Sequence, residues 1–296
     1  MRPVFAGPLA GRVDGDKSAV FAGPLAGRVP FRSPETSVTR HLAWTIALAS
    51  LLLGAAVGCG EPQARDASAP ADRLGLEGEI ALGRALAPAV EEALGGRFPD
   101  LAVQAYVRTV GQKVTRSTLM TDLPYRFEVL DAAQPREYAL PGGVVFVTRG
   151  LLARFDTEAQ LAAAIGHQLA HVNAGHVTAA LREKADLALR RRVAAAGEVP
   201  PGKPPPDADV RRLVEAVRTA AYPAEAEREA DALALDYLAA AGYNPTQMAA
   251  YLSRMSADED RIRRAAAVAE RKYADRRGRV AEEEYAREVL NRLRGP

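Results

Sequence analysis

Three of the four histidines in the chain fall within residues 164–176. His167 and His171 are four residues apart, so on an α-helix their imidazoles project from one face and can converge on one metal ion. The surrounding residues are strongly apolar, and we expect a buried helix that begins near Asp156 or Thr157, either of which can cap it. If these imidazoles bind a metal ion, the chain must fold so that a third metal ligand reaches the same face of the helix.

A second segment offers carboxylates at the same helical spacing. Glu227 and Asp231 are also four residues apart. A carboxylate completes the ligand set of one class of zinc hydrolases, and a second carboxylate can accept a hydrogen bond from the free ring nitrogen of a ligating histidine. The spacing favours Glu227 as the ligand, with Glu225 and Glu229 as alternatives. The competing interpretation is that the histidines are hydrogen-bonded core residues without a metal.

Composition limits the classes of function. The 39 basic and 37 acidic residues give a formal net charge of +2, so there is no reason to expect nucleic acid as a partner. The single cysteine, Cys59, allows neither an internal disulfide nor a cysteine-based zinc cluster. Any metal must therefore be held by histidine and carboxylate.

The first 75 residues are predicted to serve export. Residues 1–41 repeat the sequence VFAGPLAGRV and are interpreted as a disordered leader or a misassigned start. Residues 42–59 then have the short apolar run and small-residue exit of a secretory signal, and Cys59 resembles the acylated cysteine of a bacterial lipobox. We expect a periplasm-facing lipoprotein of the cell envelope, anchored to the membrane through Cys59, with residues 60–75 as a linker. The alternatives are a plain signal peptide or an uncleaved anchor.

Apolar periodicity predicts a mainly helical domain with little strand. The predicted helices are 76–94, 100–116, a histidine helix that continues to about 196, 207–220, 224–241 and a charged helical remainder divided near 277–279. The predicted strands are 125–130 and 143–148. A proline-rich loop at 200–206 interrupts the helices, because proline cannot continue them.

These motifs resemble, in order, those of the gluzincin metalloproteases that include the CAAX prenyl proteases, the membrane heat-shock protease and periplasmic quality-control proteases. The stretch 140–151 is similar to that family's edge strand, 167–176 to its metal-binding helix, 225–231 to its third-ligand helix and 241–245 to the turn after it. The resemblance covers about 76–255.

The resemblance implies an α+β, mainly helical, zincin-like domain at 76–258 with a helical extension at 259–296. It implies a small sheet whose edge strand precedes the metal-binding helix. It also implies one zinc ion held by His167, His171 and Glu227, with Asp231 as the carboxylate that supports a ligating histidine from behind. His176 is interpreted as structural.

The resemblance further implies a substrate site on the second predicted strand. An extended or unfolded polypeptide would pair with its main chain, a mode that gives affinity with little sequence preference. The residues concerned are Gly143, Val144, Val145, Phe146 and Val147.

Several residues depart from the family pattern. Gln168 stands where the His-Glu-x-x-His motif has its general base, and an amide cannot accept a proton. No histidine follows His176, so Tyr222 or Tyr243 would have to stabilise the transition state. The other departures are Gln160 for a glutamate, Arg136 and Glu137 for an Asn-Ala pair, and Ala224 for an arginine.

Three functions are therefore compared. The first is an active zinc endopeptidase that uses another base, such as Glu225. The second is a zinc-binding pseudoprotease, or a weak protease, that grips misassembled polypeptide. The third is a metal-free structural lipoprotein. The ligands favour a metalloprotease-family protein, and Gln168 favours the second function over the first.

Overall fold

The computed structural model describes residues 74–196, 208–255 and 257–294. The chain divides into two compact units, Met1–Gly60 and Glu61–Pro296, and every described residue belongs to the second unit. Several predicted segments lie outside the described residues: the leader, the signal segment with Cys59, most of the linker and the proline-rich loop. Those assignments stay predictions.

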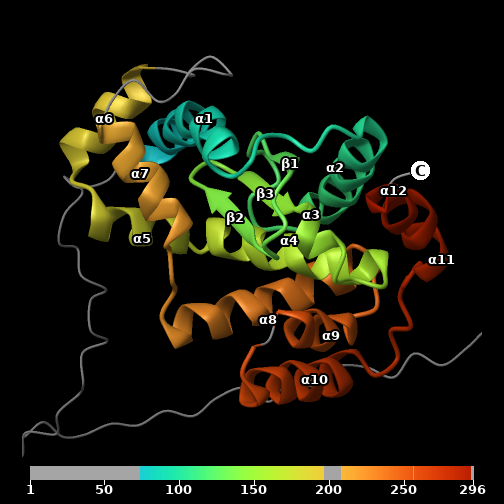
Figure 1. Ribbon diagram of the computed structural model, residues 1–296. Helices are drawn as coiled ribbons and strands as arrows, with labels where there is room; N and C mark the ends of the chain where they lie inside the picture. Colours follow the sequence, from blue (N-terminus) through green and yellow to red (C-terminus); the bar gives the residue numbers. More distant parts are fainter. Residues whose placement is uncertain (1–73, 197–207, 256, 295–296) are drawn as a thin grey trace, which may run out of the picture. The chain divides into compact units, whose positions relative to one another are not determined.

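Helices dominate the described chain, and three short strands form one sheet (Figure 1). The strands are β1 (Arg126–Leu130), β2 (Glu137–Leu140) and β3 (Val144–Thr148). The helices before residue 200 are α1 (Gly75–Ala93), α2 (Leu101–Thr115), α3 (Arg149–Leu152), α4 (Glu158–Asn173), α5 (His176–Lys184) and α6 (Leu187–Ala196). Those after it are α7 (Ala208–Arg218), α8 (Ala224–Ala240), α9 (Gln247–Arg254), α10 (Glu259–Tyr273), α11 (Glu282–Tyr285), the π-helical turn η2 (Ala286–Leu290) and α12 (Asn291–Leu293).

The sheet is mixed and has the strand order β1-β3-β2. β3 pairs with β1 in parallel and with β2 in antiparallel fashion, so β3 is the central strand. The prediction that residues 143–147 form the edge strand is therefore wrong. The edge position belongs to β2, a four-residue strand that the apolar pattern did not predict. The other edge, on β1, is partly occupied by a bridge between Arg97 and Leu130.

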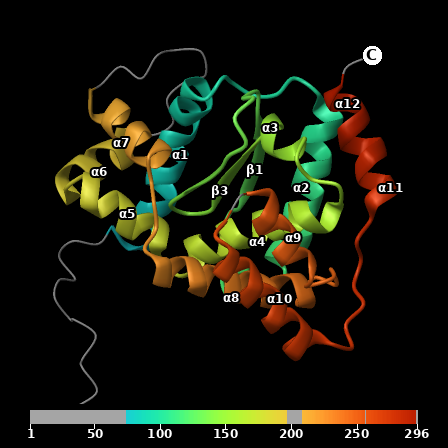
Figure 2. The same ribbon diagram turned by 60° about the horizontal axis from the view of Figure 1, so that its bottom comes forward.

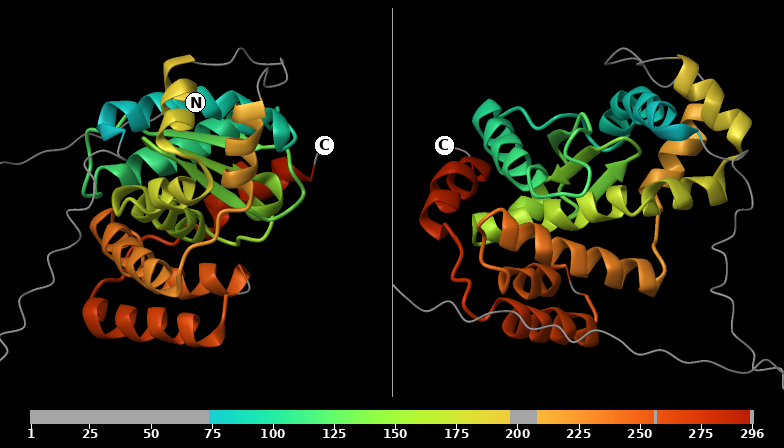
Figure 3. Two further views of the ribbon diagram at one scale, coloured as in Figure 1. Left: turned by 90° about the vertical axis from the view of Figure 1, so that its left-hand side faces the viewer. Right: turned by 180° about the vertical axis from the view of Figure 1, so that it is seen from behind.

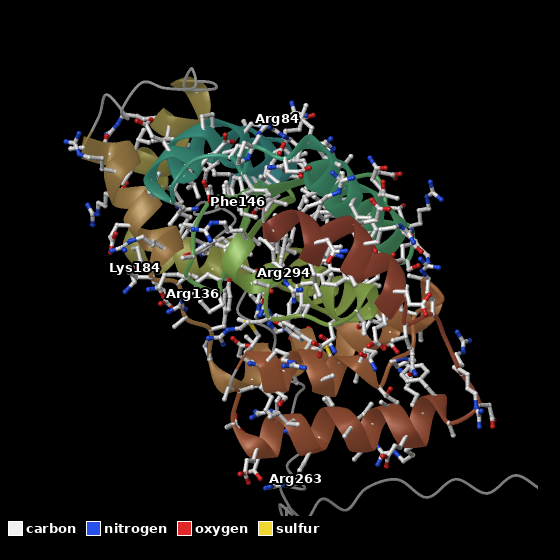
Figure 4. All side chains as sticks on the ribbon, turned by 45° about the vertical axis from the view of Figure 1, so that its right-hand side comes forward. Arg84, Arg136, Phe146, Lys184, Arg263 and Arg294 are labelled. Atoms are coloured by element: carbon white, nitrogen blue, oxygen red, sulfur yellow. The ribbon has the colours of Figure 1, made fainter. Side chains whose placement is uncertain are left out.

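Helices cover both faces of the sheet at β3. All five of its residues are buried. Val145 and Val147 belong to the core shared with α2, α4 and α8, whereas Val144 and Phe146 belong to a second core with α1, α5, α6 and α7. Phe146 accordingly lies inside the molecule among the strands (Figure 4). A continuous apolar run is typical of a strand buried on both faces.

The histidine helix α4 is buried along nearly its whole length. Every residue from 158 to 171 is buried, and the Thr157 side chain caps the helix by accepting a hydrogen bond from the Gln160 amide. α4 lies between the sheet and α8, and α10 is outermost, an order visible from the front and from behind (Figures 1 and 3). The predicted cap and the predicted burial of this helix are confirmed.

α4 ends earlier than predicted. It stops at Asn173, and Gly175 adopts a left-handed conformation with φ of 76°. Glycine tolerates this conformation at a helix end because it has no Cβ. The predicted continuation to about residue 196 is therefore wrong, since the chain turns at Gly175 and forms α5 and α6 instead.

The C-terminal helices continue the stack below α4. With the bottom of the molecule brought forward, α8, α9 and α10 lie in front of α4 (Figure 2). α10 packs against α8 and α9, so the start of the predicted extension 259–296 lies directly on the domain. Its outer face is solvated, as the Arg263 side chain, which is 65% exposed, shows by pointing outward (Figure 4).

The other helix predictions are confirmed to within a few residues. α2, for example, begins after Asp100, whose side chain accepts hydrogen bonds from the Ala102 and Val103 amides. The predicted division near 277–279 separates α10 from α11. Among the residues that the structure describes, no helix is both long enough and apolar enough to cross a lipid bilayer.

Two helical glycines give a test of the packing. A Cβ on Gly83 of α1 would lie 1.9 Å from the Pro141 carbonyl oxygen, in the turn that joins β2 to β3. A Cβ on Gly166 of α4 would meet nothing closer than 3.8 Å. Gly83→Ala should lower the free energy of unfolding by about 1–3 kcal/mol through overpacking, whereas Gly166→Ala should be neutral or raise it by up to about 1 kcal/mol. Chemical denaturation of both variants measures this, and equal stabilities would contradict the close packing of α1 on the turn.

Candidate metal centre

Three side chains converge between α4 and α8. The Nε2 atoms of His167 and His171 are 3.1 Å apart. Glu227 Oε2 lies 3.3 Å from the first and 3.7 Å from the second. Together the three residues form a group that could hold a metal ion.

The spacing of these atoms fits a tetrahedral zinc site. Ligand atoms bound to zinc at about 2.0–2.1 Å in tetrahedral geometry lie about 3.3 Å from one another. The observed separations of 3.1, 3.3 and 3.7 Å bracket this value. Glu227 Oε2 is moreover shielded from solvent and has no hydrogen-bond partner among the described residues. Two imidazole nitrogens and a carboxylate oxygen this close together in a buried site are costly unless a proton or a metal ion lies between them, so the residues present fit the metal.

Small residues at the helix interface allow this convergence. α4 and α8 pack against each other, and Ala170, Ala230 and Ala234 are all buried in the core that the two helices share. A Cβ on Gly166 would lie only 3.8 Å from the Ala234 backbone, so the two helices are close there. The four-residue spacing on α4 then directs both imidazoles toward the start of α8.

Asp231 lies directly behind the first histidine. Its Oδ1 atom is 3.1 Å from His167 Nδ1, on the side of the ring away from Glu227. Arg261 of α10 holds the same carboxylate with two hydrogen bonds of 2.6 and 2.7 Å. The Arg261 guanidinium is also 2.7 Å from Glu227 Oε2, although not at a hydrogen-bonding angle. A carboxylate behind a ligating histidine orients the ring and raises its basicity.

The second histidine is held by a different set of groups. His171 Nδ1 is 3.1 Å from His176 Nδ1, and His176 Nε2 is 3.5 Å from Glu229 Oε2. The Tyr222 ring stacks on the His171 imidazole at 3.9 Å between centroids. If His171 binds metal through Nε2, its Nδ1–H donates to His176, which fixes the tautomer. His176, predicted to be structural, thus contacts a candidate ligand.

The buried charges shift the pKa values of these groups strongly. Burial lowers the pKa of His167, but its contacts with Asp231 and Glu227 outweigh this effect and raise the pKa from 6.5 to about 9. Burial, helped by the neighbouring His167, lowers the pKa of His171 to about 4. Burial alone would raise the pKa of Glu227, but the two histidines hold it well below its usual range. At neutral pH the metal-free site therefore keeps one proton, on His167.

Gln168 contacts a carboxylate from the edge strand. Its side chain is buried, and its Nε2 donates a hydrogen bond of 3.0 Å to Glu137 Oε1 on β2. The Tyr251 hydroxyl of α9 donates to the same oxygen. Since a carboxylate can only accept, the amide nitrogen of Gln168 must face Glu137.

Some predicted residues do not reach the centre. Tyr243 donates to Glu158 Oε1 at the other end of α4, nine residues and about 13 Å of helix from His167. Glu225 is exposed and belongs to no metal-holding group among the described residues. Tyr222 is the one of the two suggested tyrosines that lies at the site.

Three residues at the centre were not predicted. They are Glu137, Tyr251 and Arg261. Glu137 was visible in the sequence only as a departure from the family's Asn-Ala pair. Arg261 lies in the charged helical remainder, whose pattern gives no sign of a contact with the histidines. No local spacing could have connected either one to the histidines.

Two histidines from one helix and a glutamate from a second define the gluzincin class of metallopeptidase. A comparison with family models agrees: the chain belongs to peptidase family M48, which matches residues 101–285 and thus spans the site from α2 to α11. Members of this family are zinc enzymes.

Curated relatives match over part of their length. The beta-barrel assembly-enhancing protease of Yersinia pestis is 25% identical over 200 residues, which cover 64% of this chain and 39% of that protein. The Escherichia coli K12 protein of the same name is 23% identical over 161 residues, 53% of this chain and 33% of that protein. The mitochondrial metalloendopeptidase OMA1 of Schizosaccharomyces pombe is 37% identical over 71 residues, 24% of this chain and 21% of that protein. The chain thus spans well under half the length of these relatives.

The proton on His167 makes zinc binding dependent on pH. Because the pKa of His167 is about 9 without metal, zinc must displace this proton at any lower pH. The apparent zinc affinity should therefore rise about tenfold per pH unit between pH 6 and pH 8. Titration against a chelating dye at constant ionic strength measures the affinity. An affinity that stays flat over this range would show that no proton is displaced.

Proposed function

We propose that this chain is a zinc-dependent member of its peptidase family that holds unfolded or misassembled polypeptides in the bacterial envelope and hydrolyses them slowly. The observation that carries the proposal is the convergence of His167, His171 and Glu227 at tetrahedral spacing. Two of the relatives are named for enhancing β-barrel assembly, which supports a polypeptide client.

The residues at the site have distinct tasks in this proposal. Zinc held by the three ligands would polarise a peptide carbonyl and make water nucleophilic at neutral pH. Asp231, held by Arg261, keeps the His167 ring in the tautomer that leaves Nε2 free. His176 does the same for His171. The fold thus orients both imidazoles from behind.

Gln168 limits the rate. It follows His167 on the helix, where the family motif has its general base. Its amide can orient a water molecule but cannot take its proton. Loss of a general base removes a factor of about 10² to 10⁴ of rate. Slow hydrolysis, rather than efficient proteolysis, is therefore the activity we propose for the chain.

The polypeptide is proposed to bind along β2 rather than β3. β3 is paired on both sides, so its main chain has no hydrogen bonds to offer a substrate. β2 has a strand partner on one side only within the described sheet, and its residue Glu137 contacts Gln168 at the centre. An extended segment added to this edge would run past the candidate zinc ligands.

A second candidate function is a pseudoprotease that grips polypeptide without cutting it. The amide at Gln168 is the observation that favours it. A metal-free structural role is favoured less, because it leaves the Glu227 lone pair buried and without a hydrogen bond.

Metal analysis together with a cleavage assay tests the proposal. The purified chain should contain one zinc ion, and it should cleave a permanently unfolded polypeptide, such as reduced and alkylated α-lactalbumin, at a low rate. Gln168→Glu restores a carboxylate at the motif position and should raise this rate by about 10²-fold or more. Zinc content is measured by mass spectrometry and cleavage by gel densitometry.

Two substitutions on α8 provide the controls. Glu227→Gln removes a candidate ligand and should lose the zinc, whereas Glu225→Gln changes an exposed neighbour and should keep it. Absence of zinc from the parent and from Gln168→Glu would refute a zinc protein. A parent rate equal to that of Gln168→Glu would refute the view that Gln168 limits catalysis.

The proposed anchor gives a separate prediction. If Cys59 is acylated, the exported chain should fractionate with membranes and incorporate a labelled fatty acid. Cys59→Ser should abolish the label and release the protein from the membrane fraction. A chain that stays in the membrane without the cysteine would instead point to an uncleaved apolar anchor.

A further inference from the structure

The Glu137 carboxylate lies one hydrogen bond from the position of the missing base. Gln168 Nε2 is 3.0 Å from Glu137 Oε1, and the Tyr251 hydroxyl donates to the same oxygen. The edge strand β2 therefore places a carboxylate against Gln168, the residue that stands where the family motif has a glutamate.

The second oxygen of this carboxylate has no partner. Glu137 Oε2 is shielded from solvent and accepts no hydrogen bond from any described residue. A buried carboxylate oxygen without a donor is unfavourable in the resting state. A water molecule or a substrate N–H that reaches this oxygen would supply the donor that it lacks.

The Glu137 carboxylate is linked to the metal centre through Gln168, which directly follows the candidate ligand His167 on α4. Burial raises the pKa of Glu137, while the charge of His167 lowers it and that of Glu227 raises it further. Hydrogen bonds from Tyr251 and Gln168 favour the ionised form. A carboxylate with a raised pKa is a better proton acceptor near neutral pH than an exposed one.

We propose that Glu137 is the general base of this site and supplies, from the edge strand, the proton acceptor that the motif helix lacks. The proposal rests on the zinc-dependent hydrolysis proposed above. Gln168 then orients the attacking water and holds Glu137 in place. This arrangement transfers the base from α4 to β2, the strand along which the polypeptide is proposed to lie.

The proton transfers of the proposed reaction balance at Glu137. Glu137 takes one proton from the attacking water as the water oxygen bonds to the peptide carbonyl carbon. The protonated carboxyl then gives that proton to the peptide nitrogen as the carbon–nitrogen bond breaks. The products are a carboxylic acid and an amine, and Glu137 returns to its ionised form.

A structural brace between β2, α4 and α9 is the competing role for Glu137. Glu137→Gln separates the two roles, because its amide oxygen can still accept from Gln168 and Tyr251 but cannot take up a proton. A matched control is Glu128→Gln on β1, at the opposite edge of the sheet, a buried carboxylate paired with Arg97 outside the site.

The decisive experiment compares the zinc-loaded parent with Glu137→Gln, Gln168→Glu and the double variant on the unfolded polypeptide. Glu137→Gln should lose about 10²-fold or more of the parent rate, and the double variant should cleave as well as Gln168→Glu. Glu128→Gln should match the parent. Glu137→Gln should also keep its thermal unfolding midpoint and its zinc affinity, the latter within about threefold, because Glu137 is not a ligand.

The outcomes separate this inference from the proposed function. Parent-like cleavage by Glu137→Gln would overturn the inference alone, as would a parent that is inactive while Gln168→Glu cleaves. Loss of zinc from Glu137→Gln would make Glu137 a ligand and would overturn it too. Absence of zinc and of cleavage in every variant would overturn the proposed function itself.

The pH profile gives an independent readout. Tyr251→Phe removes a hydrogen bond that lowers the pKa of Glu137. The acidic limb of the parent's rate profile should therefore move to higher pH in Tyr251→Phe, because the base is protonated at higher pH. The same substitution in the double variant, where the base lies on α4, should leave that limb in place. An unmoved limb in the parent background would contradict the assignment.

Discussion

The close approach of α4 and α8 is the interaction on which the site depends. Gly166 and the alanines that face it let the backbones come near enough for Glu227 to reach two imidazoles on the adjacent helix. The resulting group of two imidazole nitrogens and a carboxylate oxygen is crowded and needs a proton or a metal ion between its members. The interface that stabilises the hydrophobic core is thus also the one that creates a demand for a cation. Metal binding at this site, as proposed, would be coupled to folding through the same pair of helices.

The charged side chains around this interface largely balance one another. Glu137, Glu227 and Asp231 bring three carboxylates toward one buried region, and Arg261 lies against two of them. Without metal, the remaining negative charge is met by the proton that His167 retains up to a pKa of about 9. The outermost helix α10 therefore has an electrostatic task in addition to its packing on α8 and α9. Buried charges are tolerated here because each has a counter-charge or a hydrogen-bond donor.

Features within single helices could be predicted from the sequence, whereas relations between elements could not. The helical repeat places His167 beside His171 and Glu227 beside Asp231 wherever the helices lie. The order of strands is a tertiary property, and the unbroken apolar run of β3 was a sign of a central strand that the family resemblance obscured. Glu137 meets Gln168 across 31 residues of sequence, so no spacing rule connects them. The end of α4, by contrast, has a local signal in the sequence, since Gly175 can adopt the left-handed conformation that ends a helix.

The separation of Glu137 from the histidines has a mechanical consequence. A base that shares a helix with its metal ligands moves with them as one rigid body. Glu137 instead belongs to a strand whose connecting turn is clamped by α1 at Gly83. Glu137 lies at the end of β2 away from that turn, so its position relative to the ligands can change with the strand, for example when a polypeptide binds along it as proposed. In such an arrangement, binding of the polypeptide would itself place the proposed proton acceptor for the reaction.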